Sequence, residues 1–202
     1  MESETIDYES FLTDALADGQ IDQIVASEGR TILALFDYLF NNRRALVDRL
    51  STINCKRAEI VNEIMRGNDA AECIRKIWPK LKRIVANGTG MEAEEKERIG
   101  RYIGDIAWNH GVLSVPETIL GRATDDNSAT FTLDKKHCFY EFIDETDETA
   151  NPILLRDIQI GRTYRLIITN DSRLYRLYTD YKIRFVENTV SSNIFVPVHI
   201  WN

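Results

Sequence analysis

The apolar positions in the first half of the chain recur with the period of an α-helix. Residues 9–25, 30–50 and 56–67 each place apolar side chains on one face at this spacing. Gly19 predicts a break in the first stretch, and the pair Asn41–Asn42 predicts an interruption in the second. The first half is therefore expected to be a series of short amphipathic helices.

The residues at the ends of the next two helices predict where they stop and start. Gly67 is placed to end the third helix, and Asn68 or Asp69 can cap the short helix that follows. That short helix must end near Trp78, because Pro79 disfavours helical backbone in the residue before it.

After the proline the pattern changes twice. Residues 81–88 are strand-like, and residues 91–111 predict a helix whose acids lie at its N-terminal end, where the helix dipole favours them. Beyond this helix, apolar and polar residues alternate in short runs rich in aromatic and β-branched side chains, which predicts strands. These runs are residues 131–134, 138–143, 162–170, 173–179, 181–187 and 192–201.

The order of these elements predicts the fold class. A helical N-terminal half, one β–loop–α unit and then a mainly antiparallel sheet or partial barrel indicate an α+β protein. Because no linker or repeat interrupts the chain, we expect one domain over residues 1–202, helical over about 10–78 and sheet-containing over about 79–202.

Composition narrows the functional classes. The 202 residues include 44% hydrophobic and 28% charged side chains, which is ordinary for a globular domain. A net charge of −7 argues against a general nucleic-acid coat protein, and no stretch is long and apolar enough to predict a membrane span. The N-terminus is acidic and polar, unlike a signal peptide, and three scattered cysteines give no disulfide framework. A cytoplasmic protein without a membrane partner is expected.

Several segments, taken in order, resemble a known enzyme family. They are "CKRAEIVNEIM", "IWPKLKRIVANGTG", "GVLSVPETILG", "FYEFID", "IQIGRTYRLIITN" and "LYRLYTDYKIRFV". Across about residues 10–187 they resemble the middle of the large domain of the auxin-responsive promoter family, the acyl-acid amido synthetases. These enzymes belong to the adenylate-forming superfamily. The resemblance therefore implies part of an adenylate-forming-type α/β core.

The resemblance also implies a chemistry and a place for it. The family activates a carboxylic acid with ATP and magnesium as an acyl-adenylate, and then passes the acyl group to an amine. Segments of this chain that match the family's motifs form a candidate residual pocket for a nucleotide or a small carboxylic acid. Its residues are Gly88, Thr89, Gly90, Arg122, Ala123, Thr124, Tyr175, Arg176 and Asp180. For the loop from Gly88 to Gly90, a simple glycine turn between a strand and a helix is the favoured interpretation.

The motifs depart from the family's pattern where charge is needed. In the family's Tyr-x-x-Ser-Glu motif the glutamate binds the metal, and Ala123 stands at that position, with Asp125 and Asp126 displaced beyond it. One deletion would place Asp180 at the aspartate of the family's Tyr-Arg-x-Gly-Asp motif. The family's phosphate loop and its small C-terminal domain have no counterpart in this sequence.

These departures favour a non-catalytic relative, a pseudoenzyme with no catalytic residue, metal ligand or cofactor of its own. It would act as a binding, regulatory or interaction module, through self-association or a protein partner. The alternative is an ATP-dependent acid–amino acid ligase that uses ATP and magnesium at a site rebuilt from Asp125 or Asp126 and Asp180.

A third functional class is suggested by residues 156–184, where seven basic residues outnumber three acids and tyrosines are interleaved. A basic aromatic sheet face can bind single-stranded nucleic acid by charge and stacking. A solvated sheet face with cross-strand pairs is the favoured interpretation, and nucleic acid is not the expected partner.

The remaining polar features predict structural roles. The acidic run Asp144, Glu145, Asp147 and Glu148 lacks the spacing of a calcium loop and predicts a solvated hairpin. His110, His137 and His199 are far apart and lack metal-ligand spacing. The apolar C-terminal residues are expected to pair in a sheet or lie in an interface. They are Ile194, Phe195, Val196, Val198, Ile200 and Trp201.

Overall fold

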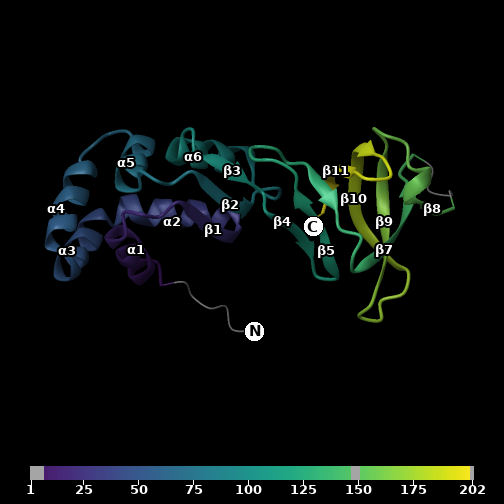
Figure 1. The fold of residues 1–202 in the computed structure, drawn as a ribbon, viewed down its shortest axis with the longest axis horizontal. Coiled ribbons are helices and arrows are strands. Elements are labelled where there is room, and N and C mark those ends of the chain that lie inside the picture. The colour runs from purple at the N-terminus through teal and green to yellow at the C-terminus, as the bar shows by residue number, and fades with distance from the viewer. Residues whose placement is uncertain (1–6, 147–150, 201–202) are drawn as a thin grey trace. The chain divides into compact units, whose positions relative to one another are not determined.

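The computed structural model describes residues 7–146 and 151–200 (Figure 1). The chain forms two compact units, residues 1–108 and residues 109–202. The boundary lies at the end of the β–loop–α segment and not near residue 79, where the sequence changes from helical to strand-like. The α+β class expected from the sequence is confirmed, with a helical first part and an antiparallel second part.

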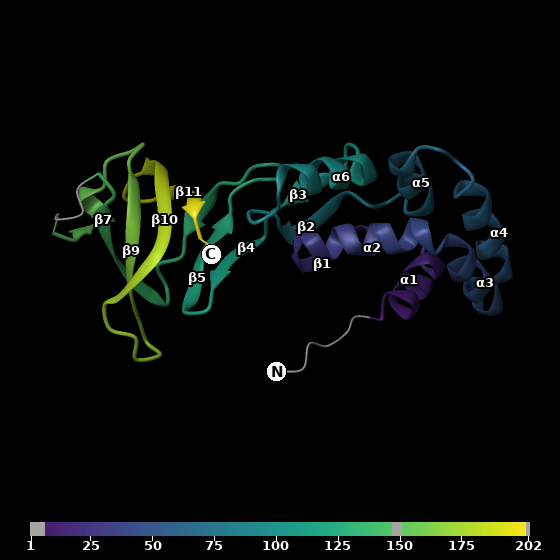
Figure 2. The ribbon, with the colours of Figure 1, turned by 180° about the vertical axis from the view of Figure 1, so that it is seen from behind.

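Over residues 7–108, the N-terminal unit has six helices and a small sheet of order β1-β2-β3, in which β1 and β2 are parallel. Helix α2 lies along β1 and β2, with α6 beside it (Figures 1 and 2). The helices are α1 (Tyr8–Ala17), α2 (Gly29–Asn41), α3 (Arg43–Ile53), α4 (Cys55–Ile64), α5 (Ala70–Ile77) and α6 (Ala93–Ile103). The strands are β1 (Gln23–Glu28), β2 (Arg83–Asn87) and β3 (Ala107–Asn109).

Local side chains fix most of these helix ends as the sequence predicts. Asn42 separates α2 from α3, and Asp69 caps α5 by accepting a hydrogen bond of 3.0 Å from the backbone N–H of Glu72. Helix α5 ends just before Trp78. Helix α6 ends earlier than predicted, at Gly104 and not at Gly111, because Gly104 adopts a left-handed φ of 57° that suits a residue without a side chain.

The helical expectation is wrong for residues 23–28, which form β1. Ile24 and Val25 pair in parallel with Ile84 and Val85 of β2. Their β-branched side chains favour extended backbone, and the pairing partner lies about sixty positions further along the chain, outside the reach of a local pattern.

One buried core holds the N-terminal unit together, with Leu12, Phe36, Leu46 and Trp78 among its most buried side chains. Two further contacts complete the C-terminal end of α1. Arg57 donates to the carbonyl of Leu16, and the indole N–H of Trp78 donates to the carbonyl of Ala15 at 2.8 Å. These carbonyls belong to the last turn of a helix and have no partner within it.

The C-terminal unit is an eight-stranded sheet of order β4-β5-β6-β11-β10-β9-β7-β8. Its neighbouring strands are antiparallel. The strands are β4 (Val112–Val115), β5 (Thr118–Ala123), β6 (Phe131–Leu133), β7 (Cys138–Asp144), β8 (Ile153–Leu154), β9 (Thr163–Asn170), β10 (Leu177–Asn188) and β11 (Asn193–His199), with a 3₁₀ turn at Leu155–Asp157. The run 181–187 lies within β10 as predicted, whereas only the last three residues of the run 173–179 belong to that strand, because β10 begins at Leu177.

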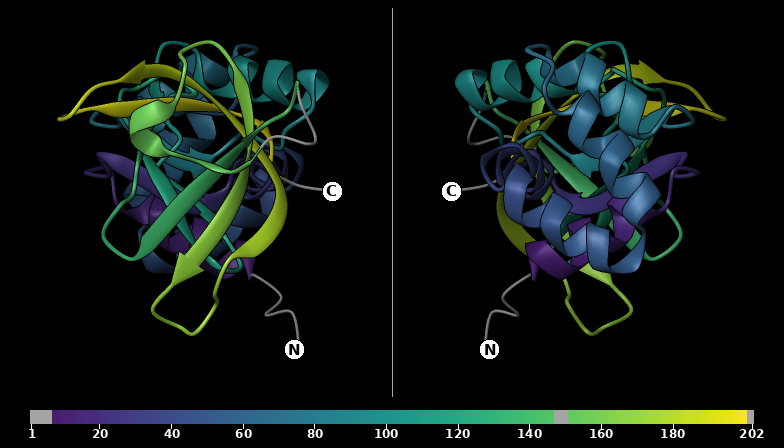
Figure 3. Two further views of the ribbon diagram at one scale, coloured as in Figure 1. Left: turned by 90° about the vertical axis from the view of Figure 1, so that its right-hand side faces the viewer. Right: turned by 90° about the vertical axis from the view of Figure 1, so that its left-hand side faces the viewer.

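This sheet curls, so that strands far apart in its order come into contact (Figure 3). From the β4–β5 hairpin, the carbonyl of Ile119 accepts from the Tyr140 hydroxyl of β7, and the carbonyl of Glu117 accepts from Asn170 of β9 at 2.9 Å. The curl encloses a core of aromatic residues that includes Phe131, which is fully buried.

The apolar C-terminal run pairs within this sheet, as expected. Phe195 pairs with Phe131 of β6 and with Phe185 of β10, and Ile200 is buried; Trp201 lies outside the described residues. No helix within residues 7–146 or 151–200 has the length and apolarity needed to cross a bilayer.

Candidate ligand-binding site in the C-terminal unit

A bulge in β10 shapes the candidate site. Tyr178 pairs with Ile167 of β9, and Lys182 pairs with Arg165, so the three residues 179–181 face the single residue Leu166. Two residues are therefore extra, and such bulges bend a strand and redirect its side chains. The buried Thr179 holds the bulge in place, since its hydroxyl donates to the carbonyl of Leu166 at 2.8 Å.

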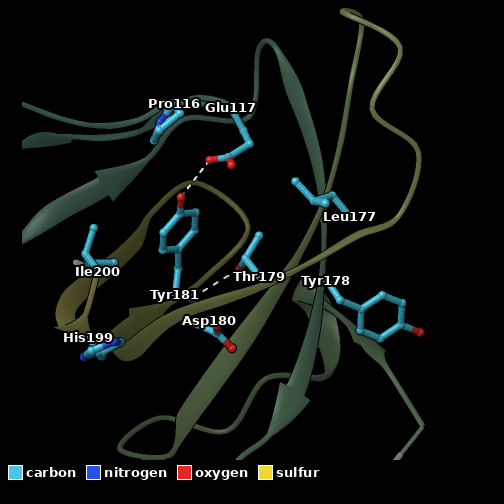
Figure 4. A pocket seen from close by; sticks show the side chains of 9 residues that line it. All are labelled: Pro116, Glu117, Leu177, Tyr178, Thr179, Asp180, Tyr181, His199 and Ile200. Carbon is cyan, nitrogen blue, oxygen red and sulfur yellow. Dashed lines mark hydrogen bonds between the residues drawn. The ribbon is translucent and has the colours of Figure 1, made fainter. Parts of the chain in front are cut away.

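A pocket of about 340 Å³ lies beside this bulge, between β10, the β4–β5 turn and the end of β11 (Figure 4). It is lined by Pro116, Glu117, Leu177, Tyr178, Thr179, Asp180, Tyr181, His199 and Ile200. Three distant segments of the sequence thus meet at one place in the C-terminal unit.

The Tyr181 side chain joins two of these segments. Its hydroxyl donates to Oε2 of Glu117 at 2.8 Å, and Figure 4 shows the ring pointing from β10 toward the β4–β5 turn. Burial, and then the hydrogen bond to the Glu117 carboxylate, raise the pKa of the Tyr181 hydroxyl to about 12. The hydroxyl is therefore a proton donor to Glu117 throughout the neutral range, and the pair holds the pocket wall in place.

The charged lining of the pocket is acidic. Glu117 and Asp180 supply carboxylates, and no lysine or arginine is among its described lining residues. The Asp180 side chain is exposed to solvent, whereas the oxygen atom Oε2 of Glu117 is engaged by Tyr181. This arrangement can accept hydrogen bonds from hydroxyl or amino groups, and it disfavours phosphate or carboxylate groups by repulsion.

Of the sequence-predicted site residues, Asp180 lines this pocket. Arg176 lies just before β10, and its guanidinium is half-exposed and engaged in a two-pronged ion pair with Glu141, at 2.9 and 3.0 Å. Tyr175 is 80% exposed in the β9–β10 loop. Tyr175, Arg176 and Asp180, which were expected together, therefore lie apart. Tyr175 is in an exposed loop, Arg176 is paired with Glu141, and Asp180 lines the pocket.

Arg122, Ala123 and Thr124 lie at the other end of β5, apart from this pocket. Arg122 and Ala123 pair with Thr132 and Phe131 of β6, and Arg122 also pairs with Val112 of β4. The Thr124 hydroxyl lies 2.5 Å from that of Thr130. These residues are part of the sheet ladder.

The two aspartates that could replace a missing metal ligand lie just beyond this strand. Asp125 is exposed, and Oδ1 of Asp126 accepts a hydrogen bond of 2.8 Å from the amide of Asn109. Within residues 7–146 and 151–200, no three His, Cys, Asp or Glu side chains converge so that they could hold a metal ion.

Gly88, Thr89 and Gly90 belong to the N-terminal unit. The backbone N–H and hydroxyl of Thr89 both donate to Oδ1 of Asn87, at 3.0 and 2.8 Å, and the carbonyl of Gly90 accepts from Arg30. These contacts form a turn between β2 and α6, which is the simpler of the two interpretations that the sequence allows.

The basic residues of the second half largely pair with acids. Besides Arg176, Arg162 pairs with Asp144 at 2.6 Å, and Lys182 and Arg165 both lie within ion-pair distance of Glu145. The expected cross-strand pairs are therefore present. They reduce the net charge that a nucleic-acid strand would meet, and the nucleic-acid alternative stays a prediction without further support.

The acidic run and the histidines take structural positions where they are described. Asp144 and Glu145 make the ion pairs just given, at the start of the β7–β8 hairpin, and Asp147 and Glu148 lie outside the described residues. The His110 ring packs edge-on against Phe131, and His137 lies 3.7 Å from Asp134. His199 lines the pocket.

Sequence reasoning missed most of the pocket. Glu117, Thr179, Tyr181 and His199 come from three segments, and nothing in the local pattern links them. The Pro116–Glu117 pair signals a turn, but only the curl of the sheet places that turn against β10.

The fold is that of part of the solved acyl acid amido synthetases. Over 95% of its length it superimposes on 39% of the solved GH3.15 acyl acid amido synthetase, with a TM-score of 0.84 at 17% sequence identity. Against AtGH3.15 acyl acid amido synthetase in complex with 2,4-DB, the TM-score is 0.79, again over 95% of this chain and 38% of that chain. At these identities the likeness concerns the fold.

Sequence comparison finds similarity to the same group of proteins. Residues 131–191 match the GH3 family central domain. The chain is 25% identical over 125 residues to the 4-substituted benzoates–glutamate ligase GH3.12 of Arabidopsis thaliana, covering 59% of this chain and 22% of that protein. It is also 25% identical over 164 residues to the indole-3-acetic acid-amido synthetase GH3.4 of Arabidopsis thaliana, covering 74% and 26%.

The expected resemblance is thus confirmed: the chain is a relative of the GH3 acyl acid amido synthetases. It spans about a quarter of the length of these curated relatives.

Proposed function

We propose that this chain is a non-catalytic binding module derived from the GH3 acyl acid amido synthetases, with its ligand pocket beside the β10 bulge. The ligand would be a small molecule that presents hydroxyl or amino groups to Asp180 and Glu117. The observation that supports the proposal is the register of β5, in which Ala123 pairs with Phe131 of β6. By the resemblance, Ala123 stands where the family has a metal-binding glutamate.

The register matters because Asp125 or Asp126 could replace that glutamate only if β5 slipped. A slip by one residue would turn every side chain of the strand to the opposite face, and a larger slip would break its pairing with both neighbours. Pairs to β4 and to β6 hold β5 on both edges, and Asp126 is engaged by Asn109. This supports a site that lacks its magnesium ligand.

ATP, which the family resemblance implies, fits the pocket only in part. Asp180 could accept hydrogen bonds from ribose hydroxyls, but the two carboxylates and the absence of a lysine or arginine from the described lining do not suit a triphosphate. We therefore propose a nucleoside-like ligand in preference to an intact nucleotide or a carboxylic acid. No adenylation step is assigned to these residues.

The direct test of lost catalysis is acid-dependent exchange of labelled pyrophosphate into ATP, measured with a panel of hormone-like carboxylic acids. We expect no exchange above the level without protein. Robust exchange that disappears in Asp180→Asn would refute the proposal and establish the alternative, an acid–amino acid ligase with a rebuilt site.

The test of binding uses adenosine as the probe and NMR shifts of the full chain as the readout. We expect saturable shifts at residues 177–181 and 199–200. The affinity for adenosine should fall about tenfold in Asp180→Asn, because charge-assisted hydrogen bonds are lost. Asp171→Asn, which removes an exposed acid outside the pocket lining, is the matched control and should bind like the parent. Equal weakening in both variants would argue against the pocket.

Self-association is the second part of this proposal. Tyr178 and Phe139 are 62% and 55% exposed, and they flank β9 on the outer face of the sheet. Exposed aromatic residues of this kind are typical of protein interfaces. Sedimentation velocity over a range of concentrations should show a dimer that Phe139→Ser together with Tyr178→Ser abolishes. A monomer at every concentration would remove this part.

A further inference from the structure

A second pocket, independent of the proposed function, lies in the N-terminal unit. Helices α3 and α4 run side by side, as Figure 3 shows in its right-hand view, and the start of α3 meets the end of α4. The pocket between them has a volume of about 400 Å³. It is lined by Arg43, Arg44, Val47, Asn62, Met65, Arg66 and Asn68.

Its polar side chains are rich in hydrogen-bond donors. Three guanidinium groups and two carboxamides surround the space, and no carboxylate is among its lining residues. Arg43 is positioned by a hydrogen bond of 3.1 Å to the carbonyl of Met65, and Arg66 by an ion pair of 2.6 Å with Glu63. Arg44 makes no ion pair within the described part of the chain.

The backbone of α3 adds to the positive charge at this pocket. Asn42 makes no side-chain cap hydrogen bond to α3, and its backbone carbonyl accepts from the N–H of Leu46. The N-terminus of an eleven-residue helix also carries the positive end of its dipole. Arg43 and Arg44 are the first two residues of α3, so their side chains lie at this positive end of the helix.

The neighbouring acids do not cancel this excess of positive charge. Glu63 offsets one guanidinium of the three, and Asp69 is committed to capping α5 through the backbone N–H of Glu72. Because guanidinium groups match the planar faces of oxyanions with paired hydrogen bonds, the cluster is suited to an anion with several oxygens.

We propose that this pocket binds the phosphate group of a phosphate monoester, with the guanidinium groups of Arg43, Arg44 and Arg66 around its oxygens. Val47 and Met65 form the apolar part of the lining, against which a non-polar group attached to the phosphate can pack. The space exceeds what a bare phosphate needs, which favours an ester.

The test is a titration of the full chain, followed by amide NMR shifts at constant ionic strength, with inorganic phosphate and with phenyl phosphate. We expect saturable shifts confined to residues 42–47 and 62–68, and tighter binding of phenyl phosphate than of inorganic phosphate. Arg44→Gln and Arg66→Gln should each weaken binding about tenfold, the effect of losing one charge-assisted contact. Arg184→Gln, the same change at an exposed site on β10, should bind like the parent.

Three results would overturn the proposal. They are shifts spread over basic residues throughout the chain, an equal response to sodium chloride, and unchanged affinity in both pocket variants. Arg44 and Arg66 are exposed, so unaltered spectra elsewhere in the protein will show that each variant remains folded. Because the pocket near Asp180 belongs to the other unit, loss of adenosine binding there leaves this result unaffected.

Discussion

Replacing Arg57 should destabilise the N-terminal unit more than any other change of a charged side chain discussed here. Its guanidinium donates from Nε to the carbonyl of Leu16 at 2.9 Å and from a terminal nitrogen to the carbonyl of Ile77 at 2.5 Å. These carbonyls end α1 and α5. Arg57 is half-buried, and this burial lowers the pKa of its guanidinium.

The size of the effect follows from these two contacts. A hydrogen bond to a charged group contributes about 1.5–3 kcal/mol, and the desolvation of the guanidinium offsets part of the sum. We expect Arg57→Gln to lower the free energy of unfolding by about 2–4 kcal/mol. With an m-value of about 1.5 kcal/mol per molar urea, the midpoint should fall by about 1.3–2.7 M.

The assay is urea unfolding followed through the indole N–H signal of Trp78, which reports on this unit alone because the indole is buried against α1. Arg57→Lys can reach one carbonyl at a time and should lose about half as much. Arg101→Gln removes an exposed pair with Glu97 and should shift the midpoint little. A midpoint for Arg57→Gln equal to that of Arg101→Gln would refute the reasoning.

Three other changes test the C-terminal unit. Gly121→Ala should lower the free energy of unfolding by about 1–3 kcal/mol, because the new Cβ would lie 2.7 Å from a backbone carbonyl of β6. Gly100→Ala is the control, since its Cβ meets open space and should not destabilise the protein; thermal unfolding compares the two variants. Because the pKa of Tyr181 is raised to about 12, its hydrogen bond to Glu117 should stabilise the fold fully below a pH of about 10 and lose this effect as the pH rises through about 12. Unfolding measured at several pH values should show a smaller loss of stability with pH in Tyr181→Phe. A double-mutant cycle on Arg176 and Glu141 should give a coupling energy of about 1 kcal/mol at this half-exposed site, and a value near zero would contradict the paired geometry.

Local rules were sufficient where a single residue decides an element's end. Asp69 accepts a backbone hydrogen bond from the first turn of α5, and Pro79 limits the helix before it, so both could be predicted from their side-chain chemistry. The alternation in the second half predicted strands for the same reason, since each apolar residue needs the buried face.

The site depended on contacts that no local pattern contains. The turn at Glu117 meets Tyr181 only because the sheet curls, and sixty-four positions separate the two residues. The ion pair between Arg176 and Glu141 likewise joins the β9–β10 loop to β7, thirty-five positions away in the sequence. Motif matching could place Asp180 near a family aspartate, but it could not show which neighbours surround it.

The two extra residues of β10 have a consequence for how this segment can change in length. Because the bulge adds an even number, Ile183 and Phe185 still face the core beyond it. A pair of residues could be removed and leave the far half of the strand in phase, whereas removal of one would turn both side chains into water unless the bulge absorbed the difference. The length of this segment can therefore change in steps of two while the buried face of β10 stays in place.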